Sequence, residues 1–102
     1  MNVIDLNGRT AIVTGGARGI GFAAAQKLLA SGAAVALWDV DQAALAGAVA
    51  ALKQSDRVRA AVVDVTNEAS IATAVGALIA DFGKIDILVN NAGITGGNAP
   101  LW

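Results

Sequence analysis

The sequence predicts an α/β fold in which helices cover both faces of a parallel sheet. Short apolar runs alternate with longer stretches of helical spacing, and within each run the apolar residues occupy successive positions. Such runs suit strands that are buried on both faces, as they are in parallel sheets. Because strand and helix alternate, right-handed crossovers bring successive strands into parallel pairing. The predicted class is therefore a doubly wound parallel sheet.

Four strands and three helices are expected. The strands cover Ala11–Val13, Ala34–Trp38, Ala60–Val63 and Ile85–Val89, the last of which contains Asp86. Between them, apolar residues recur every three or four positions and form one stripe on each helix. The stripes consist of Ile20, Ala24 and Leu28, then Leu45, Val49 and Leu52, then Ile71, Val75, Leu78 and Phe82.

Residues typical of helix ends support this division. Gly32 and Gly83 follow the first and third helical stretches, where a left-handed residue commonly ends a helix. Asp41 and Thr66 stand where an N-cap is expected, because a short side-chain oxygen can accept a hydrogen bond from the free N–H groups there. No repeat or linker divides the chain, so residues 1–102 are assigned to one domain.

The composition excludes several classes of function. Seven basic and eight acidic residues give a net charge of -1, which leaves no broad positive surface for nucleic acid. The chain has no Cys and no His, so no disulfide and no tightly held transition metal is expected. The N-terminus lacks the pattern of a signal peptide, and the uncharged stretches are too short to cross a bilayer. These features predict a cytoplasmic protein without membrane contact.

A glycine-rich turn leaves the first strand and opens the first helix. It reads Thr14-Gly15-Gly16-Ala17-Arg18-Gly19-Ile20-Gly21. We expect the bend between Val13 and Ile20 to present bare main-chain amides to a diphosphate, since a helix N-terminus attracts anions and glycine has no Cβ to keep them away. Gly15, Gly19 and Gly21 would permit the tight bend, the approach of the phosphates and close helix packing. The position after the first strand of a βαβ unit favours this function over a bend without a ligand.

A phosphate-binding loop of the NTPase kind is excluded by residue type. Gly16 and Gly21 have the required separation. However, Phe22 and Ala23 stand where a Lys and a Ser or Thr would contact phosphate and Mg²⁺.

Asp39 closes the second expected strand and lies 18 residues after Gly21. This spacing suits an acid that accepts hydrogen bonds from the hydroxyls of adenosine ribose. A carboxylate beside a 2′-phosphate would bring like charges together, so Asp39 favours NAD over NADP. Arg18 favours the opposite choice, because a guanidinium in the turn can contact a 2′-phosphate. A solvated acid at a strand end is the alternative without a binding function.

These motifs resemble those of a known family. The pattern Thr14-Gly15-(three residues)-Gly19-Ile20-Gly21 resembles the cofactor fingerprint of short-chain dehydrogenases/reductases (SDRs). Asn90-Asn91-Ala92-Gly93, after the fourth strand, resembles the second signature of that family, and Asp64-Val65 is similar to its adenine-contacting pair. The resemblance covers the chain from about Gly8 to Trp102. It implies a Rossmann-type sheet in which the strands, numbered along the chain, have the order 3-2-1-4. This sheet is incomplete here, because the family's sheet has more than the four strands expected in this chain.

The resemblance also implies a role for each motif. The glycine-rich turn would line the pyrophosphate and the adenosine ribose, Asp39 would hold that ribose, and the Asp64 carboxylate and Val65 backbone would bind adenine. The segment that begins with Asn90 would lie under the ribose nearer nicotinamide, with Asn90 itself tying neighbouring strands together. The implied cofactor-binding residues are Gly15, Arg18, Gly19, Ile20, Gly21, Asp39, Asp64, Val65, Asn91, Ala92 and Gly93.

The chain lacks the residues that carry the redox step in that family. The family uses a Ser, a Tyr, a Lys four positions after the Tyr, and an Asn on the helix after the fourth strand. This chain has neither Tyr nor His, so no phenol or imidazole is present to move a proton, and we assign no catalytic residue. The sequence is interpreted as the truncated N-terminal part of an NAD-dependent oxidoreductase for an alcohol/carbonyl pair, inactive by itself.

Two alternatives remain open at this point. An S-adenosylmethionine-dependent methyltransferase also places glycines after a first strand and an acid after a second, but it would leave the Asn90–Gly93 segment without a purpose. A non-catalytic binding module would explain the missing catalytic residues. For the full-length protein, the resemblance implies a small-molecule substrate and a homo-oligomer.

The cut sheet predicts poor solubility. The fourth strand would form an apolar open edge, and such an edge pairs readily with other chains. The apolar residues concerned are Ile85, Ile87, Leu88 and Val89, together with Leu101 and Trp102 near the end of the chain.

Overall fold

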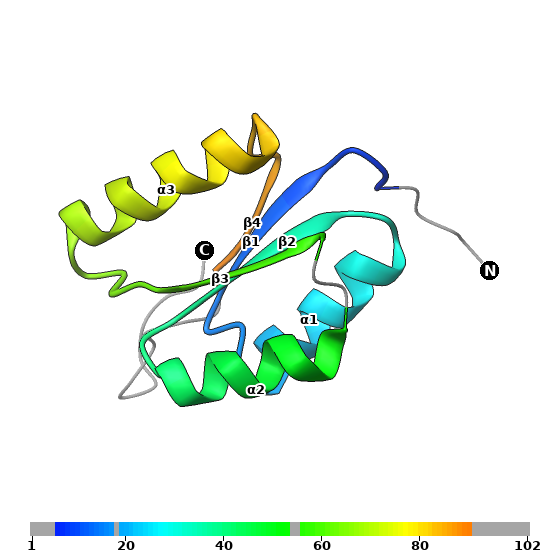
Figure 1. The fold of residues 1–102 in the computed structure, drawn as a ribbon, viewed down its shortest axis with the longest axis horizontal. Coiled ribbons are helices and arrows are strands. Elements are labelled where there is room, and N and C mark those ends of the chain that lie inside the picture. Colours follow the sequence, from blue (N-terminus) through cyan, green and yellow to red (C-terminus); the bar gives the residue numbers. More distant parts are fainter. Residues whose placement is uncertain (1–5, 18, 54–55, 91–102) are drawn as a thin grey trace.

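The computed structural model describes residues 6–17, 19–53 and 56–90 and contains a single parallel sheet. Its strands lie in the order β3-β2-β1-β4, which confirms the predicted fold class and strand order (Figure 1). All three pairings, β1 with β2, β1 with β4 and β2 with β3, are parallel. The elements are β1 (Thr10–Thr14), α1 (Gly19–Ala30), β2 (Ala34–Asp39), α2 (Gln42–Leu52), β3 (Val58–Val62), α3 (Glu68–Phe82) and β4 (Ile87–Asn90).

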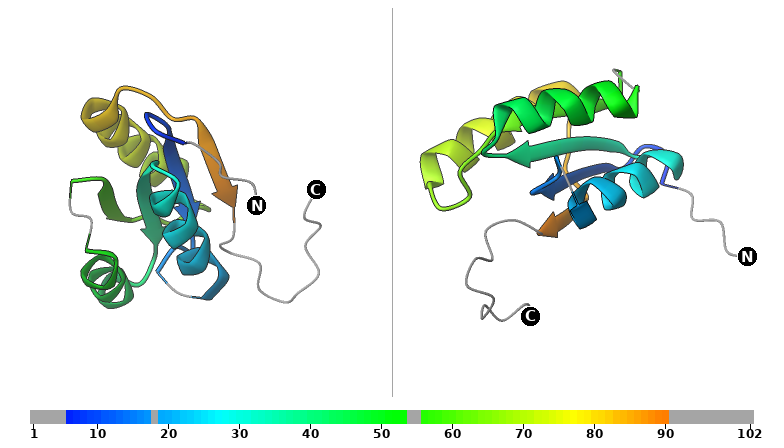
Figure 2. Two further views of the ribbon diagram at one scale, coloured as in Figure 1. Left: turned by 90° about the vertical axis from the view of Figure 1, so that its right-hand side faces the viewer. Right: turned by 90° about the horizontal axis from the view of Figure 1, so that it is seen from below.

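The helices lie on both faces of the sheet and form two apolar cores. In Figure 1 α3 lies above the strands and α1 and α2 lie below them, and the left view of Figure 2 shows the same three layers from another side. The core on the side of α1 and α2 consists of Val13, Ala25, Leu29, Val35, Leu37, Leu45, Ala48 and Val58. The core on the side of α3 consists of Ile12, Ala36, Trp38, Val63 and Leu78.

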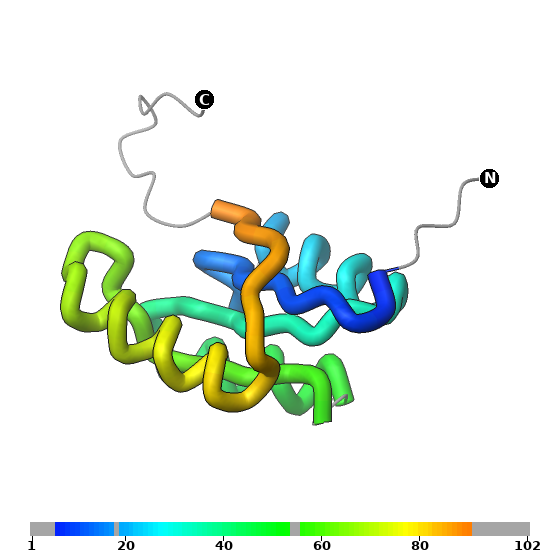
Figure 3. Tube along the Cα trace, turned by 90° about the horizontal axis from the view of Figure 1, so that it is seen from above, coloured from blue at the N-terminus to red at the C-terminus, as the bar shows by residue number. Residues whose placement is uncertain are grey.

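Burial distinguishes the two central strands from the two outer ones. Every residue of β1 is buried, and every residue of β2 except the first. In β3 and β4 burial alternates, so that Val62 is 53% exposed and Leu88 is 61% exposed. The expectation of strands covered on both faces is therefore wrong for the outer pair, because β3 and β4 are the edges of this sheet. Figure 3 shows α3 leading directly into the edge strand β4.

The apolar stripe of α1 is displaced by one residue from the predicted one. Ile20 is 78% exposed, and Ala24 and Leu28 are only partly buried. Small residues allow the helix axis to approach the sheet closely, and this contact decides which face is buried. The buried residues of α1 are Gly21, Ala25 and Leu29. The predicted stripes of α2 and α3 are confirmed, since all their members belong to or pack against the two cores.

The structure confirms most of the predicted helix ends. The Asp41 carboxylate caps α2 by accepting from the Ala44 N–H at 3.0 Å, and Gly83 ends α3 with φ 83. Gly32 follows α1 with φ 103. The predicted N-cap at Thr66 is wrong, because the side chain of the next residue, Asn67, caps α3. Within the described residues, no helix has the length and apolar character needed to cross a membrane.

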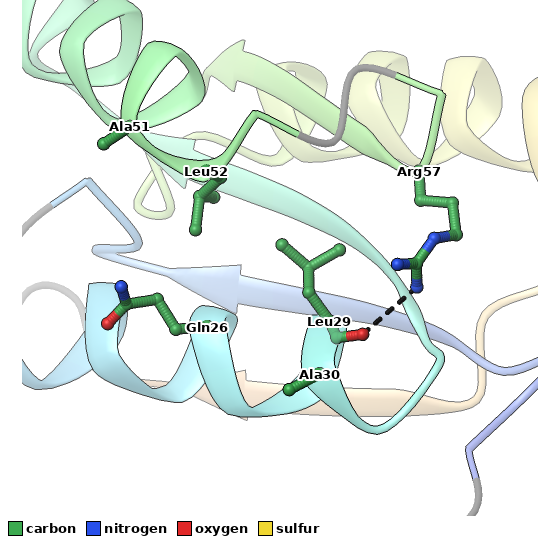
Figure 4. Close-up of a pocket in the computed structure, with 6 residues that line it drawn as sticks. All are labelled: Gln26, Leu29, Ala30, Ala51, Leu52 and Arg57. Carbon is green, nitrogen blue, oxygen red and sulfur yellow. Dashed lines mark hydrogen bonds between the residues drawn. The ribbon is translucent and has the colours of Figure 1, made fainter.

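The end of the sheet where the strands begin is closed by Arg57. Its guanidinium donates to the Leu29 carbonyl at 3.2 Å and to the Ala33 carbonyl at 3.0 Å, so a cation sits at the C-terminus of α1 (Figure 4). A pocket at this place is lined by Gln26, Leu29, Ala30, Ala51, Leu52 and Arg57. Because parallel-sheet proteins bind ligands beyond the carboxyl ends of the strands, this pocket is at the wrong end for a nucleotide.

Asp86 connects β4 to the start of β1. Its N–H donates to the Thr10 carbonyl at 2.8 Å, and its carboxylate accepts from the Thr10 N–H at 2.9 Å. Lys84 lies 3.6 Å and Arg9 3.5 Å from the carboxylate. The Thr10 N–H, helped by the two cations, lowers the pKa of Asp86 below its ordinary value.

Asp86→Asn should reduce stability at neutral pH and make it less sensitive to acid. A carboxyl group whose pKa is lowered by folding stabilises the protein above its unfolded-state pKa of about 4, and this contribution is lost as the pH falls through the folded-state pKa. Urea unfolding at pH 7 and at successive acid pH values measures the difference between wild type and variant. The difference should shrink below about pH 4, and a constant difference would contradict the assigned role.

Candidate functional site

The predicted site residues in the described part of the chain gather where the strands end. Gly15 follows β1, Asp39 ends β2, Asp64 follows β3 and Asn90 ends β4. In a parallel sheet all these positions lie at the same end of the sheet, the end where the strands have their carboxyl termini. The chain reverses its direction of growth across the sheet between β1 and β4, and such a reversal is where nucleotides bind in open α/β sheets.

Three consecutive amides of the glycine-rich turn, those of Gly15, Gly16 and Ala17, are bonded to the end of β2. Gly15 N–H and Gly16 N–H both donate to the Trp38 carbonyl, at 2.7 and 3.3 Å. Ala17 N–H donates to Oδ2 of Asp39 at 3.4 Å. The expectation that the whole bend presents bare amides is therefore wrong for these three residues, because β2 lies close enough to accept from them.

Amides without a partner in their own helix belong instead to the first turn of α1. The N–H groups of the first turn of any helix have no partner within that helix, and here they belong to Gly19, Ile20 and Gly21. Gly19 has φ 61, and a Cβ at that position would meet nothing within 4 Å. The surface above Gly19 is thus open to an anion, whereas Gly21 is buried and allows close packing of α1.

Gly16 is required for the shape of the turn, although the sequence motifs assign it no role. A Cβ there would lie 2.8 Å from the Val13 carbonyl oxygen and 2.9 Å from Cδ2 of Leu37. The residue is buried and lets the turn fold tightly over β1 and β2. Gly15, with φ 63, supplies the sharp bend as predicted. The pair of adjacent glycines was the available signal, since a bend with a positive φ explains only one of them.

Asp39 points toward the glycine-rich turn and is almost completely buried. It is 8% exposed, and its carboxylate accepts from Ala17 N–H through Oδ2 and from Asp41 N–H through Oδ1, at 3.4 and 3.1 Å. This orientation agrees with the predicted location of the acid beside the bend and disagrees with a solvated strand-end acid.

Asp64 places a second carboxylate at the carboxyl end of the strands, where it is exposed to solvent. Its Oδ1 accepts from the Thr66 hydroxyl at 2.6 Å and from the Thr66 N–H at 2.9 Å. These two bonds, the hydroxyl first, lower the pKa of Asp64. The adjacent Val65 packs against the α3-side core. In the described ranges no group of three or more His, Cys, Asp or Glu residues forms a candidate metal centre.

Thr14 and Asn90 join the carboxyl ends of β1 and β4. The buried Thr14 hydroxyl lies within hydrogen-bond distance of two acceptors, the Val89 carbonyl at 3.3 Å and Oδ1 of Asn90 at 3.1 Å. This contact across the strands agrees with the structural role implied for Asn90. The remaining predicted site residues, Arg18, Asn91, Ala92 and Gly93, lie outside the described residues.

The sheet order, the glycine-rich turn and the acid beside it define a dinucleotide-binding type of α/β protein. The chain belongs to the short chain dehydrogenase family, whose model matches residues 9–101. A relative from Sphingomonas sp. (strain SKA58), a 2-dehydro-3-deoxy-L-rhamnonate dehydrogenase (NAD(+)), is 45% identical over 95 residues, which are 93% of this chain and 37% of the relative. The chain thus spans little more than a third of that protein. The family match removes the methyltransferase alternative.

Solved structures show the same fold. The structure of NAD+-bound xylitol dehydrogenase has a TM-score of 0.83 and 41% identity, over 89% of this chain and 35% of that one. The C-domain of a bacterial malonyl-CoA reductase with NADP also has a TM-score of 0.83, with 35% identity over 89% of this chain and 16% of that one. Proteins similar to this chain therefore include both NAD and NADP binders.

Proposed function

We propose that this chain is the NAD-binding N-terminal part of an SDR oxidoreductase that acts on an alcohol/carbonyl pair. The single observation that carries the cofactor choice is the buried Asp39 carboxylate beside the glycine-rich turn. In this position it would repel the 2′-phosphate of NADP and accept hydrogen bonds from the ribose hydroxyls of NAD. The Sphingomonas relative, which is named as an NAD(+) enzyme, supports the same choice.

The residues present fit a dinucleotide. The open surface above Gly19 would admit the pyrophosphate to the free N–H groups at the start of α1, and Arg18 would lie beside it. Asp64 and Val65 would bind the adenine ring. Asn91, Ala92 and Gly93 would lie under the ribose nearer nicotinamide. When bound, the nicotinamide group supplies the hydride chemistry, and these residues hold and orient it.

We place the proton transfer outside these 102 residues. The chain contains no Tyr and no His, so none of the residues assigned to the cofactor has a phenol or an imidazole that could move a proton. Residues 1–102 would then be one part of a single domain, inactive without the remainder. The complete protein would act on a small-molecule substrate and would assemble as a homo-oligomer.

Asp39→Arg tests the cofactor choice. NAD affinity should fall at least about tenfold, because a hydrogen bond to a charged group contributes roughly 1.5–3 kcal/mol and each 1.4 kcal/mol is a factor of ten. NADP affinity should stay constant or rise, because an arginine can pair with the 2′-phosphate. Calorimetric titration with both cofactors measures the two affinities.

Asp41→Asn is the matched control for this titration. Asp41 lies two residues from Asp39 and caps α2, and Asn is an equally good N-cap, so cofactor affinity should be unchanged. Undiminished NAD binding by the Asp39→Arg variant would disprove the role given to Asp39.

A further inference from the structure

We propose that Asp39 is a positioning residue that holds the glycine-rich turn in its bent shape before any cofactor binds. This role is separate from the contact with ribose, and only the latter rests on the proposed function. The proposal starts from the hydrogen bonds of three consecutive amides in the turn, which all point at the last two residues of β2.

The backbone of β2 fixes the first half of the turn. The Trp38 carbonyl accepts from both Gly15 N–H and Gly16 N–H, and no side chain takes part in these bonds. A third contact, from Ala17 N–H, requires the Asp39 side chain, because its acceptor is the carboxylate oxygen Oδ2. Asp39 thereby extends the attachment by one residue, close to the start of α1 at Gly19.

The Asp39 carboxylate is itself held in place. Its other oxygen, Oδ1, accepts from the Asp41 N–H at 3.1 Å, and the residue is only 8% exposed. A buried carboxylate is costly unless it is hydrogen-bonded, so the side chain has little freedom to leave these two amides. The acceptor that faces Ala17 is therefore a fixed one.

Holding the turn and binding ribose are compatible. An ionised carboxylate can accept about four hydrogen bonds, and the two amides occupy half of that capacity. Two ribose hydroxyls could use the rest without releasing Ala17. A turn that is already bent costs the ligand less ordering entropy on binding. Substitutions made at Asp39 to change the cofactor should therefore also loosen the turn, and this loosening offsets part of any gain in NADP affinity.

Asp39→Ala tests the positioning role, because an alanine has no side-chain acceptor for either of the two amides. In the whole chain without cofactor, the Ala17 amide should exchange its hydrogen about tenfold faster or more in this variant, as expected for loss of a bond to a charged group. Amide exchange followed by NMR measures this rate, with the Val13 amide in β1 as the reference for global unfolding.

Asp41→Asn is again the control, because it removes the same charge two residues away and keeps its helix cap. It should leave the Ala17 exchange rate unchanged. The proposal is overturned if the Ala17 amide of the wild type exchanges its hydrogen as fast as an amide in an unstructured peptide. This measurement does not depend on the folding of any variant. It is also overturned if both variants accelerate Ala17 equally. Protection of Ala17 without any binding of NAD would instead disprove the proposed function alone.

Discussion

Gly16→Ala should destabilise the fold by about 1–3 kcal/mol, and Gly16→Val by more. The added Cβ would lie 2.8 Å from the Val13 carbonyl oxygen, 2.9 Å from Cδ2 of Leu37 and 3.3 Å from its Cα. Two of these three atoms are backbone atoms of central strands, which cannot move aside as a flexible side chain can. The clash must therefore be relieved by shifting the turn. Urea-induced unfolding of wild type and variants measures the loss.

Gly47→Ala is the matched control for Gly16→Ala. Gly47 lies in α2, is exposed, and a Cβ there would meet nothing within 4 Å. Because alanine is a better helix former than glycine, this change should stabilise the protein by up to about 1 kcal/mol. If the two substitutions had the same effect, the steric explanation for Gly16 would be wrong.

Leu37→Ala should reduce stability by about 2–5 kcal/mol, the usual range for a leucine removed from a packed core. Leu37 is 0% exposed, lies in the central strand β2 and belongs to the core between the sheet and helices α1 and α2. Domains have total stabilities of only about 5–15 kcal/mol, so this loss should leave a substantial unfolded fraction at moderate temperature. Thermal unfolding followed by circular dichroism measures it.

Leu88→Ala removes the same atoms from an exposed site. Leu88 is 61% exposed in the edge strand β4, so its replacement should change stability by no more than about 0.5 kcal/mol. It should also reduce self-association, if the exposed β4 edge causes the poor solubility predicted from the sequence. Sedimentation of both chains at equal concentration tests this, and unchanged association would mean that Leu88 does not contribute to it.

The candidate site could be predicted from the sequence only in part. The locations of Gly15, Gly19 and Asp39 follow from their positions relative to the strands, because a strand end and a helix start are local features. The adjacent Gly15 and Gly16 are a signal in the chain, but the steric reason for Gly16 is not, since it depends in part on Leu37, a residue of β2. The bonds from Gly15 and Gly16 to Trp38 depend on the same packing.

The buried faces show a similar division. The stripes of α2 and α3 follow from periodicity, but the displaced stripe of α1 depends on how closely Gly21 and Ala25 bring that helix to the sheet. Apolar runs were expected to be buried on both faces in all strands. Val62 and Leu88 are exposed because β3 and β4 are the outer strands of the sheet. The sequence of one strand does not show whether that strand lies in the centre or at the edge.

The order of strands and helices and their parallel pairing follow from the amino-acid sequence, because periodicity and helix caps are local signals and crossovers are right-handed. The strand order and the turn with its acid follow from the motifs shared with SDRs. The folded structure was needed to show which amides of the turn are already bonded, which glycine is sterically indispensable, and that the Asp39 carboxylate faces Ala17. These properties arise where β1 and β2 meet, and contacts between segments distant in sequence exist only after the chain has folded.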